Sequence, residues 1–153
     1  MSNVIRRCRE CGVGEIRPLA KAGRRGSYKN LELAIPADLK IPTCNNCGAE
    51  WMDRTAATAL DGALEKVYRE VLRKLWAAAI RKIQQQKLSM RRLEQLLGLS
   101  EGYLSKVSNG RSEPSAELVA HLGTLATDVE GRTRELEHLW KSAEQLTKHG
   151  KAA

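Results

Sequence analysis

Apolar residues recur at helical spacing over most of the chain after residue 53. Residues 53–87 contain no proline and a single glycine, Gly62, so this spacing predicts one long helix or two abutting helices. The first half of the apolar stripe has no obvious partner within the chain, so we expect it to pack on another subunit or on the C-terminal helix. The positions that form the stripe are Ala56, Ala59, Leu60, Ala63, Leu64, Val67, Val71, Leu72, Leu75, Trp76, Ala79, Ile80 and Ile83.

Two short helices are predicted next, separated by a tight turn. Ser89 is placed to cap a helix over residues 90–97, and Ser100 is placed to cap a second helix that ends at Ser108. Gly98 lies in the turn between them, and Gly110 predicts a left-handed end to the second helix. Two short helices across a short turn that contains glycine form a helix-turn-helix.

Two further helices complete the helical part of the chain. Pro114 and Ser115 predict the start of a helix that continues through Leu125. Residues 128–148 then predict a last amphipathic helix, whose apolar face is typical of a core or of a dimer contact. This face consists of Leu136, Trp140, Ala143 and Leu146.

Strand-like patterns are confined to the first 53 residues. Runs with strand character cover residues 15–21 and 28–41, and residues 23–26 between them predict a turn. Pro36 and Pro42 favour edge strands or bends in this region, because proline cannot donate to a sheet. A unit this small has little core of its own.

All four cysteines lie in two similar motifs, Cys8-Arg-Glu-Cys11-Gly12 and Cys44-Asn-Asn-Cys47-Gly48. Paired Cys-x-x-Cys motifs are typical of a tetrahedral four-cysteine zinc site, and the following glycines tolerate the positive φ that such turns require. The segment between the motifs should form a small β-rich insert. The alternatives are redox-active cysteines, buried cysteines, or an iron site of the rubredoxin kind. Four thiolates leave a metal no open position, so we expect one structural zinc per chain.

Composition narrows the function classes. The net charge is +8, and residues 54–112 hold twelve basic and five acidic residues, which indicates a polyanionic partner, although a solvated helix face explains the charge equally well. Neither a signal peptide nor a transmembrane segment is predicted, so we expect a cytoplasmic protein whose thiols stay reduced. The sequence contains no catalytic constellation and no phosphate-binding glycine loop, so we do not expect an enzyme.

Residues 88–115 resemble the Xre/Cro-type helix-turn-helix family. The run Leu88-Ser-Met-Arg-Arg-Leu-Glu-Gln-Leu-Leu-Gly-Leu-Ser-Glu-Gly-Tyr-Leu-Ser-Lys-Val-Ser-Asn-Gly-Arg111, followed by Glu113-Pro-Ser115, carries the resemblance. Three positions depart from it. Met90 replaces a phosphate-binding glutamine, Glu94 replaces a small residue that lets the two helices cross closely, and Gly102 replaces an asparagine that reads a base in MqsA-type proteins.

The resemblance implies which residues meet DNA. In the Xre family the helix after the turn enters the major groove, and flanking groups hold phosphates. Carried onto this chain, the groove-facing positions are Ser100, Glu101, Gly102, Tyr103, Ser105 and Lys106, and the phosphate-binding positions are Ser89, Arg91, Asn109 and Arg111.

The order of the cysteine-rich segment and the helix-turn-helix resembles MqsA-type antitoxins with their YgiT-type zinc finger, over residues 5–127. This resemblance implies that the ribbon binds a toxin protein while the helical half binds the promoter. We therefore expect a homodimer that binds a palindromic operator in double-stranded DNA and represses its own operon.

Together these patterns predict a mainly α-helical protein with a small β-rich zinc ribbon at the N-terminus and an Xre-type helix-turn-helix bundle in the C-terminal half. The expected segments are a ribbon over residues 1–53, a linking helix over 54–87, the helix-turn-helix over 88–127, and a C-terminal helix and tail over 128–153. The expected function is a sequence-specific regulator that acts as an antitoxin. The alternatives are a stand-alone regulator of a mobile element or defence operon, and a protein-interaction module without DNA binding.

Overall fold

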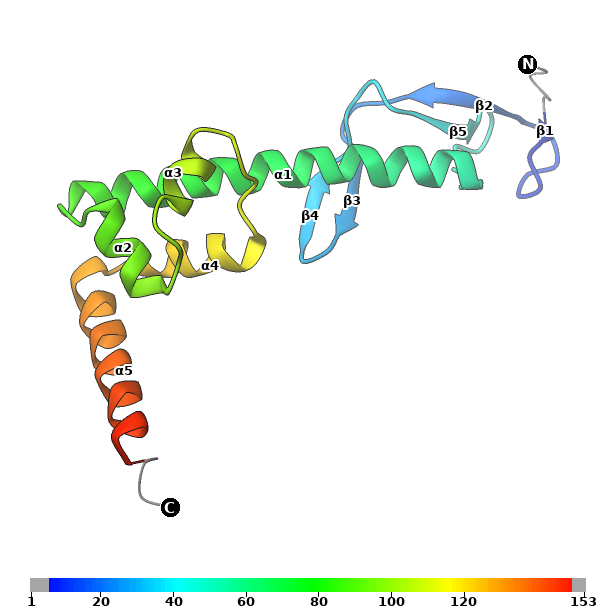
Figure 1. Ribbon diagram of the computed structural model, residues 1–153. Coiled ribbons are helices and arrows are strands. Elements are labelled where there is room, and N and C mark those ends of the chain that lie inside the picture. The colour runs from blue at the N-terminus through cyan, green and yellow to red at the C-terminus, as the bar shows by residue number, and fades with distance from the viewer. Residues whose placement is uncertain (1–5, 150–153) are drawn as a thin grey trace. The chain divides into compact units, whose positions relative to one another are not determined.

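The computed structural model describes residues 6–149 and confirms the expected fold class, with small antiparallel strands followed by helices (Figure 1). The strands are β1 (Arg6–Arg7), β2 (Glu15–Ala20), β3 (Arg25–Tyr28), β4 (Leu31–Ala34) and β5 (Lys40–Cys44). The helices are α1 (Arg54–Gln85), α2 (Met90–Leu97), α3 (Tyr103–Ser108), α4 (Ala116–Leu125) and α5 (Val129–His149). The chain divides into two compact units between Glu70 and Val71, inside α1, which we call the N-terminal and C-terminal units.

The strands of the N-terminal unit form two small antiparallel sheets. The first has the order β1-β2-β5, and the second is the β3–β4 hairpin. Pro42 lies in β5, at an edge of the first sheet, where a missing N–H is tolerated. The turn expected over residues 23–26 is shorter than predicted, because Arg25 and Gly26 already belong to β3. A Cβ at Gly26 would lie 3.3 Å from Leu64 Cδ1, so the hairpin approaches α1 closely at this position.

The first half of α1 packs on the β3–β4 hairpin. Leu64 and Tyr68 of the helix are buried, and the Tyr68 ring meets the Tyr28 ring edge-on at 5.5 Å between centroids. The Tyr68 hydroxyl donates to Asn30 Oδ1 at 3.2 Å. The expectation that this stripe lacks a partner within the chain was therefore wrong for Leu64, which packs on the hairpin, whereas Leu60, Ala63 and Val67 are half-buried.

The second half of α1 is the first helix of the C-terminal unit. All five helices contribute buried side chains to this unit, so its core does not depend on the strands. These buried side chains are Leu72, Trp76, Ala79, Ile80, Ile83, Leu93, Leu96, Leu104, Val107, Val119, Leu122, Leu125 and Val129. The low aromatic content of the sequence accords with this aliphatic core.

Local capping defines most of the helix boundaries. Ser89 Oγ accepts the N–H of Arg92 at 3.2 Å at the start of α2, and Ser115 Oγ accepts the N–H of Leu118 at 3.2 Å at the start of α4. The expected caps at both serines are confirmed. Ser100, by contrast, does not cap α3, which begins only at Tyr103 after a turn through Gly102.

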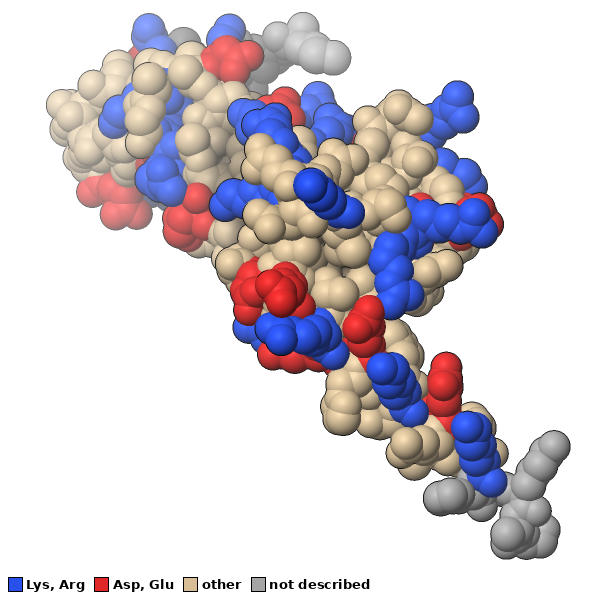
Figure 2. All heavy atoms as spheres, turned by 90° about the vertical axis from the view of Figure 1, so that its left-hand side faces the viewer, with Lys and Arg blue, Asp and Glu red and all other residues tan. Residues whose placement is uncertain are grey.

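Helix α5 contacts α2 through its N-terminal half. Arg92 of α2 pairs with Glu137 at 2.6 Å, and the Trp140 indole donates to the carbonyl of Leu96 at 2.8 Å. Acidic and basic side chains alternate on the surface of α5 (Figure 2). Two leucines of this helix are also exposed, Leu139 at 54% and Leu146 at 77%. Within the described residues, no helix is both long and apolar enough to cross a membrane.

Candidate metal centre and helix-turn-helix surface

Both cysteine motifs fold into tight backbone turns. The first is closed by a hydrogen bond from Gly12 N to the Cys8 carbonyl at 2.9 Å, and the second by one from Gly48 N to the Cys44 carbonyl at 3.1 Å. Gly12 has a φ of 68° and Gly48 a φ of 74°, so the positive φ predicted for both glycines is confirmed. Each turn aims its two sulfurs to one side.

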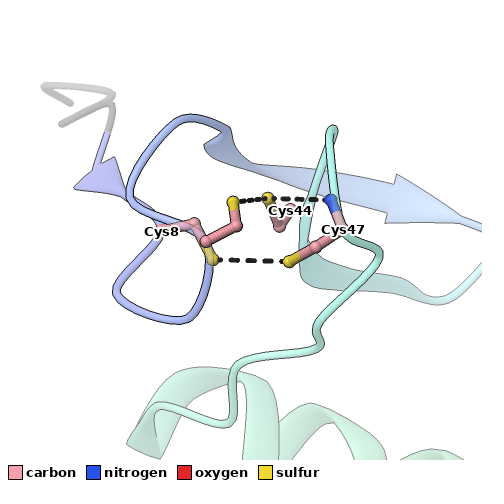
Figure 3. Close-up of side chains that lie close together, drawn as sticks. Cys8, Cys44 and Cys47 are labelled. Atoms are coloured by element: carbon pink, nitrogen blue, oxygen red, sulfur yellow. Dashed lines mark hydrogen bonds between the residues drawn. The ribbon is translucent and has the colours of Figure 1, made fainter.

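The turns bring the four sulfurs together. Cys8 Sγ lies 3.6 Å from Cys47 Sγ (Figure 3). Cys11 Sγ lies 3.7 Å from Cys44 Sγ. All four sulfurs lie within 4.8 Å of one another. A tetrahedral ion with metal–sulfur bonds of about 2.3 Å spaces its sulfurs about 3.8 Å apart, so this cluster fits such an ion at its centre. The four cysteines named from the sequence are thus placed to hold one metal ion.

Backbone N–H groups make two of the thiols acidic. The N–H groups of Gly14 and Val13 lower the pKa of Cys11 to about 6, and Gly14 N lies 3.3 Å from that sulfur. The N–H groups of Cys47 and Asn46 lower the pKa of Cys44. These hydrogen bonds stabilise the thiolate form, which is the form that binds metal.

Cys47 behaves in the opposite way. The backbone N–H of Ala49 lowers its pKa, but desolvation and the sulfurs of Cys44, Cys8 and Cys11 outweigh this effect and raise the pKa to about 12. Several adjacent thiolates repel one another in the absence of a cation. A bound dication removes this repulsion and deprotonates a coordinating thiol outright, so the cluster has the electrostatics of a metal site.

Gly14 is a part of the site that the sequence motifs did not indicate. A Cβ at this position would lie 2.4 Å from Cys44 Sγ and 2.7 Å from Asn46 Cβ, so any side chain there displaces a metal ligand. The neighbouring Glu15 N donates to Asn45 Oδ1 at 2.9 Å, which ties the two cysteine turns together. Gly14 lies outside the Cys-x-x-Cys-Gly pattern, and its role depends on a contact with a residue 30 positions away.

Arg24 supports the sheet next to the cysteines and was also missed. Its buried guanidinium donates to Glu50 Oε1 at 2.7 Å, to the carbonyls of Leu19 and Leu39, and to Thr43 Oγ1. These partners come from β2, β5 and the segments that flank them. The Arg24 guanidinium therefore donates to four acceptors in a unit whose apolar core is small.

The helix-turn-helix consists of α2, the turn through Gly102, and α3. Helix α2 ends at Gly98, which has a φ of 66°, and Leu99 N donates to the carbonyl of Glu94 at 2.9 Å. Helix α3 ends in the same way, since Gly110 has a φ of 71° and Arg111 N donates to the carbonyl of Lys106 at 2.8 Å. The left-handed end predicted at Gly110 is confirmed.

Most of the residues expected to meet DNA are exposed on this motif. Leu104 and Val107 of α3 face the core, so the remaining positions of the helix face outward. Tyr103 and Gly102 are half-buried. The exposed members of the set are Ser89, Arg91, Ser100, Glu101, Ser105, Lys106, Asn109 and Arg111. The surface is therefore polar. Its basic side chains are Arg91 of α2, Lys106 of α3 and Arg111, which follows α3.

Glu101 places an acid on this surface. Arg91 Nη2 lies 4.0 Å from Glu101 Oε1, and the side chains are 75% and 78% exposed. An ion pair this exposed adds little stability, but the proximity of the arginine offsets the acid's repulsion of a phosphate.

The comparison with protein families agrees with this geometry. Residues 78–121 match a family model described as helix-turn-helix, and the match begins inside α1 and continues through α2 and α3 into α4. The helix-turn-helix is a DNA-binding element whose second helix docks in the major groove. No curated protein matches the chain. The chain therefore carries a four-cysteine cluster and, over residues 78–121, a segment that is similar to the helix-turn-helix family.

Replacing Cys44 with serine removes one of the four ligands. We expect the purified variant to lose its metal, measured by elemental analysis, and residues 6–53 to lose amide protection in hydrogen exchange. The C-terminal unit has a separate aliphatic core and should stay protected. Ala22→Ser, in an exposed turn of the same unit, is the control and should retain the metal. An unchanged metal content in Cys44→Ser would contradict the four-cysteine site.

Gly14→Ala tests the close approach to Cys44. We expect the affinity for zinc, measured by competition with a chromogenic chelator, to fall about tenfold or more because a ligand must move. Gly62→Ala is the matched control: a Cβ there meets nothing within 4 Å, and alanine in a helix should raise stability by about 0.5–1 kcal/mol without changing zinc affinity. Equal zinc affinities for the two variants would show that Gly14 is not required.

Proposed function

We propose that this protein is a sequence-specific transcriptional regulator in which α3 reads DNA. The single observation that carries the proposal is the helix-turn-helix match over residues 78–121, which covers a motif whose outward face is polar and exposed. Sequence is read at base edges in the major groove, where a helix fits. The charge of +8, concentrated in the middle of the chain, supports a nucleic-acid partner.

The proposed contacts are of two kinds. Ser105 and Lys106 lie on the exposed face of α3 and are positioned for base edges, with Tyr103 alongside for a thymine methyl or a hydrogen bond. The remaining proposed groove-facing positions are Ser100, Glu101 and Gly102, at the turn that leads into α3. The proposed phosphate-binding groups lie at the helix ends and comprise Ser89, Arg91, Asn109 and Arg111.

The regulator is proposed to act as a homodimer on a palindromic operator. Two-fold symmetry of the protein matches two half-sites whose centres are one DNA turn apart, about 34 Å. The exposed Leu139 and Leu146 of α5 support this, because large apolar side chains on a helix surface favour a partner. The half-buried Leu60, Ala63 and Val67 of the first half of α1 are the alternative dimer contact.

The metal is proposed to be one structural zinc per chain. Four thiolates are the set that zinc prefers in structural sites, and an iron site of the rubredoxin kind is the alternative. The ribbon would then serve as a scaffold. We also propose a cytoplasmic location, because thiols stay reduced in that compartment and DNA is accessible there.

We extend the proposal to an autorepressing antitoxin of a toxin–antitoxin pair. Support comes from the order of a four-cysteine unit and a helix-turn-helix, and from the exposed apolar Val13, Leu19 and Met52 of the N-terminal unit, which favour a protein partner. An adjoining reading frame for a small basic protein would favour the antitoxin. Its absence would favour a stand-alone regulator.

Lys106→Ala and Arg111→Ala should weaken DNA binding in different ways. Lys106→Ala should cost about 1–3 kcal/mol on the protein's own upstream region and relax the preference at one base position in each half-site. Arg111→Ala should weaken binding to all sequences alike and reduce the salt slope by about one for each phosphate that the side chain no longer neutralises. Binding isotherms on the upstream region and on scrambled DNA, at several salt concentrations, measure both effects.

Lys74→Ala is the control for the removal of a positive charge. Lys74 is exposed on α1 and lies outside the proposed DNA surface, so its removal should leave the base preference unchanged. If Lys106→Ala and Arg111→Ala bind like the parent protein, α3 is not the reading helix, and the interaction-module alternative takes its place.

Sedimentation equilibrium should give a mass near twice 17.0 kDa. Introducing charge on α5 with the double change Leu139→Glu and Leu146→Glu should yield the monomer, because two carboxylates cannot be buried unpaired in an apolar contact. Leu75→Glu, at a residue on α1 that is 51% exposed, should not change the mass. A parent protein that is monomeric at micromolar concentration would exclude the proposed dimer.

A further inference from the structure

Glu94 is the one buried acid of the C-terminal unit among the described residues, and it connects α2 to the start of α3. The residue is only 5% exposed. Its Oε2 accepts the N–H of Gly102 at 3.0 Å, and its Oε1 accepts the N–H of Leu104 at 2.9 Å. Burial of a carboxylate is costly unless its oxygens find donors, so this pair of hydrogen bonds is a strong constraint on both helices.

Helix α3 has no cap of its own. Gly102 occupies the N-cap position with a φ of 80° and offers no side chain, and the helix is only six residues long. The first N–H groups of a helix have no acceptor within the helix and need one from elsewhere. Leu104 N is the group that an N-cap side chain ordinarily satisfies, so the carboxylate of Glu94 performs from α2 the function that serine performs in α2 and α4.

The position of the acid also matters for DNA. A negative charge behind the N-terminus of α3 interacts favourably with the helix dipole. The same charge repels the phosphates of a docked duplex, so by itself it weakens binding to DNA of any sequence. If Glu94 acts by positioning α3, neutralising it should weaken DNA binding. If Glu94 acts only through its charge, neutralising it should tighten DNA binding, so the two roles can be separated by experiment.

We propose that Glu94 is a positioning residue that fixes the orientation of α3 on α2, and through it the register of Tyr103, Ser105 and Lys106 on the base edges. This inference rests on the proposed DNA-binding function. Glu94 itself touches no DNA. Neutral glutamine at this position keeps the volume but presents an N–H₂ group to one of the two backbone donors, so only one of the two hydrogen bonds survives.

The test compares Glu94→Gln with the parent protein as full-length, metal-loaded chains. We expect specific binding to the upstream region to weaken about tenfold, the cost of removing a cap. Binding to scrambled DNA should stay the same or tighten, because a repulsive charge is gone. Glu130→Gln is the control, since Glu130 is an acid of the same unit that is 85% exposed on α5, and it should change neither affinity.

Hydrogen exchange on the free protein provides a second readout. In Glu94→Gln the Gly102 and Leu104 amides should lose protection, while the amides of α2 and α4 keep theirs. If Glu94→Gln fails to fold, Glu94→Asp replaces it, because aspartate keeps the charge but is too short to reach both amides. The same amides should then exchange faster.

Two results would overturn the inference. One is unchanged or tighter specific binding by the folded variant, which would mean that the charge dominates. The other is unchanged protection of Gly102 and Leu104. A parent protein that fails to distinguish its upstream region from scrambled DNA would instead refute the proposed function, and the exchange of these two amides would still decide whether Glu94 caps α3.

Discussion

Burial of apolar side chains along both halves of α1 is the interaction on which both compact units depend. Its first half places Leu64 and Tyr68 against the β3–β4 hairpin, and its second half places Trp76, Ile80 and Ile83 in the core of the C-terminal unit. Neither the hairpin nor helices α2 to α5 would bury as much apolar surface alone. Helix α1 adds buried side chains to each unit.

The N-terminal unit compensates for a small core with polar and metal chemistry. The four sulfurs lie within 4.8 Å of one another and repel one another once ionised, so a cation bound among them would stabilise the unit. Arg24 satisfies the polar groups beside the cluster. The absence of a side chain at Gly14 then makes room for Cys44. Geometry that would be costly in an apolar core is thus stabilised by hydrogen bonds, and an ion held by the four sulfurs would stabilise it further.

The C-terminal unit handles its shortest helix in a different way. Helix α3 contributes only Leu104 and Val107 to the core, and its N-terminus carries no capping side chain. Glu94 supplies the acceptors from α2, at a position where the Xre family usually has a small residue. This departure from the family pattern therefore forms a contact between α2 and the start of α3.

The sequence by itself determined the features that depend on neighbouring residues. The cysteine turns, the positive φ of Gly12 and Gly48, and the caps at Ser89 and Ser115 all arise within a few positions of the chain, so their spacing was sufficient. Only the tertiary structure decided where α3 begins, what packs on Leu64 of α1, how closely Gly14 approaches Cys44, and which amides the carboxylate of Glu94 accepts. Each of these depends on a contact between distant residues, and periodicity along the chain carries no information about which surface will lie opposite.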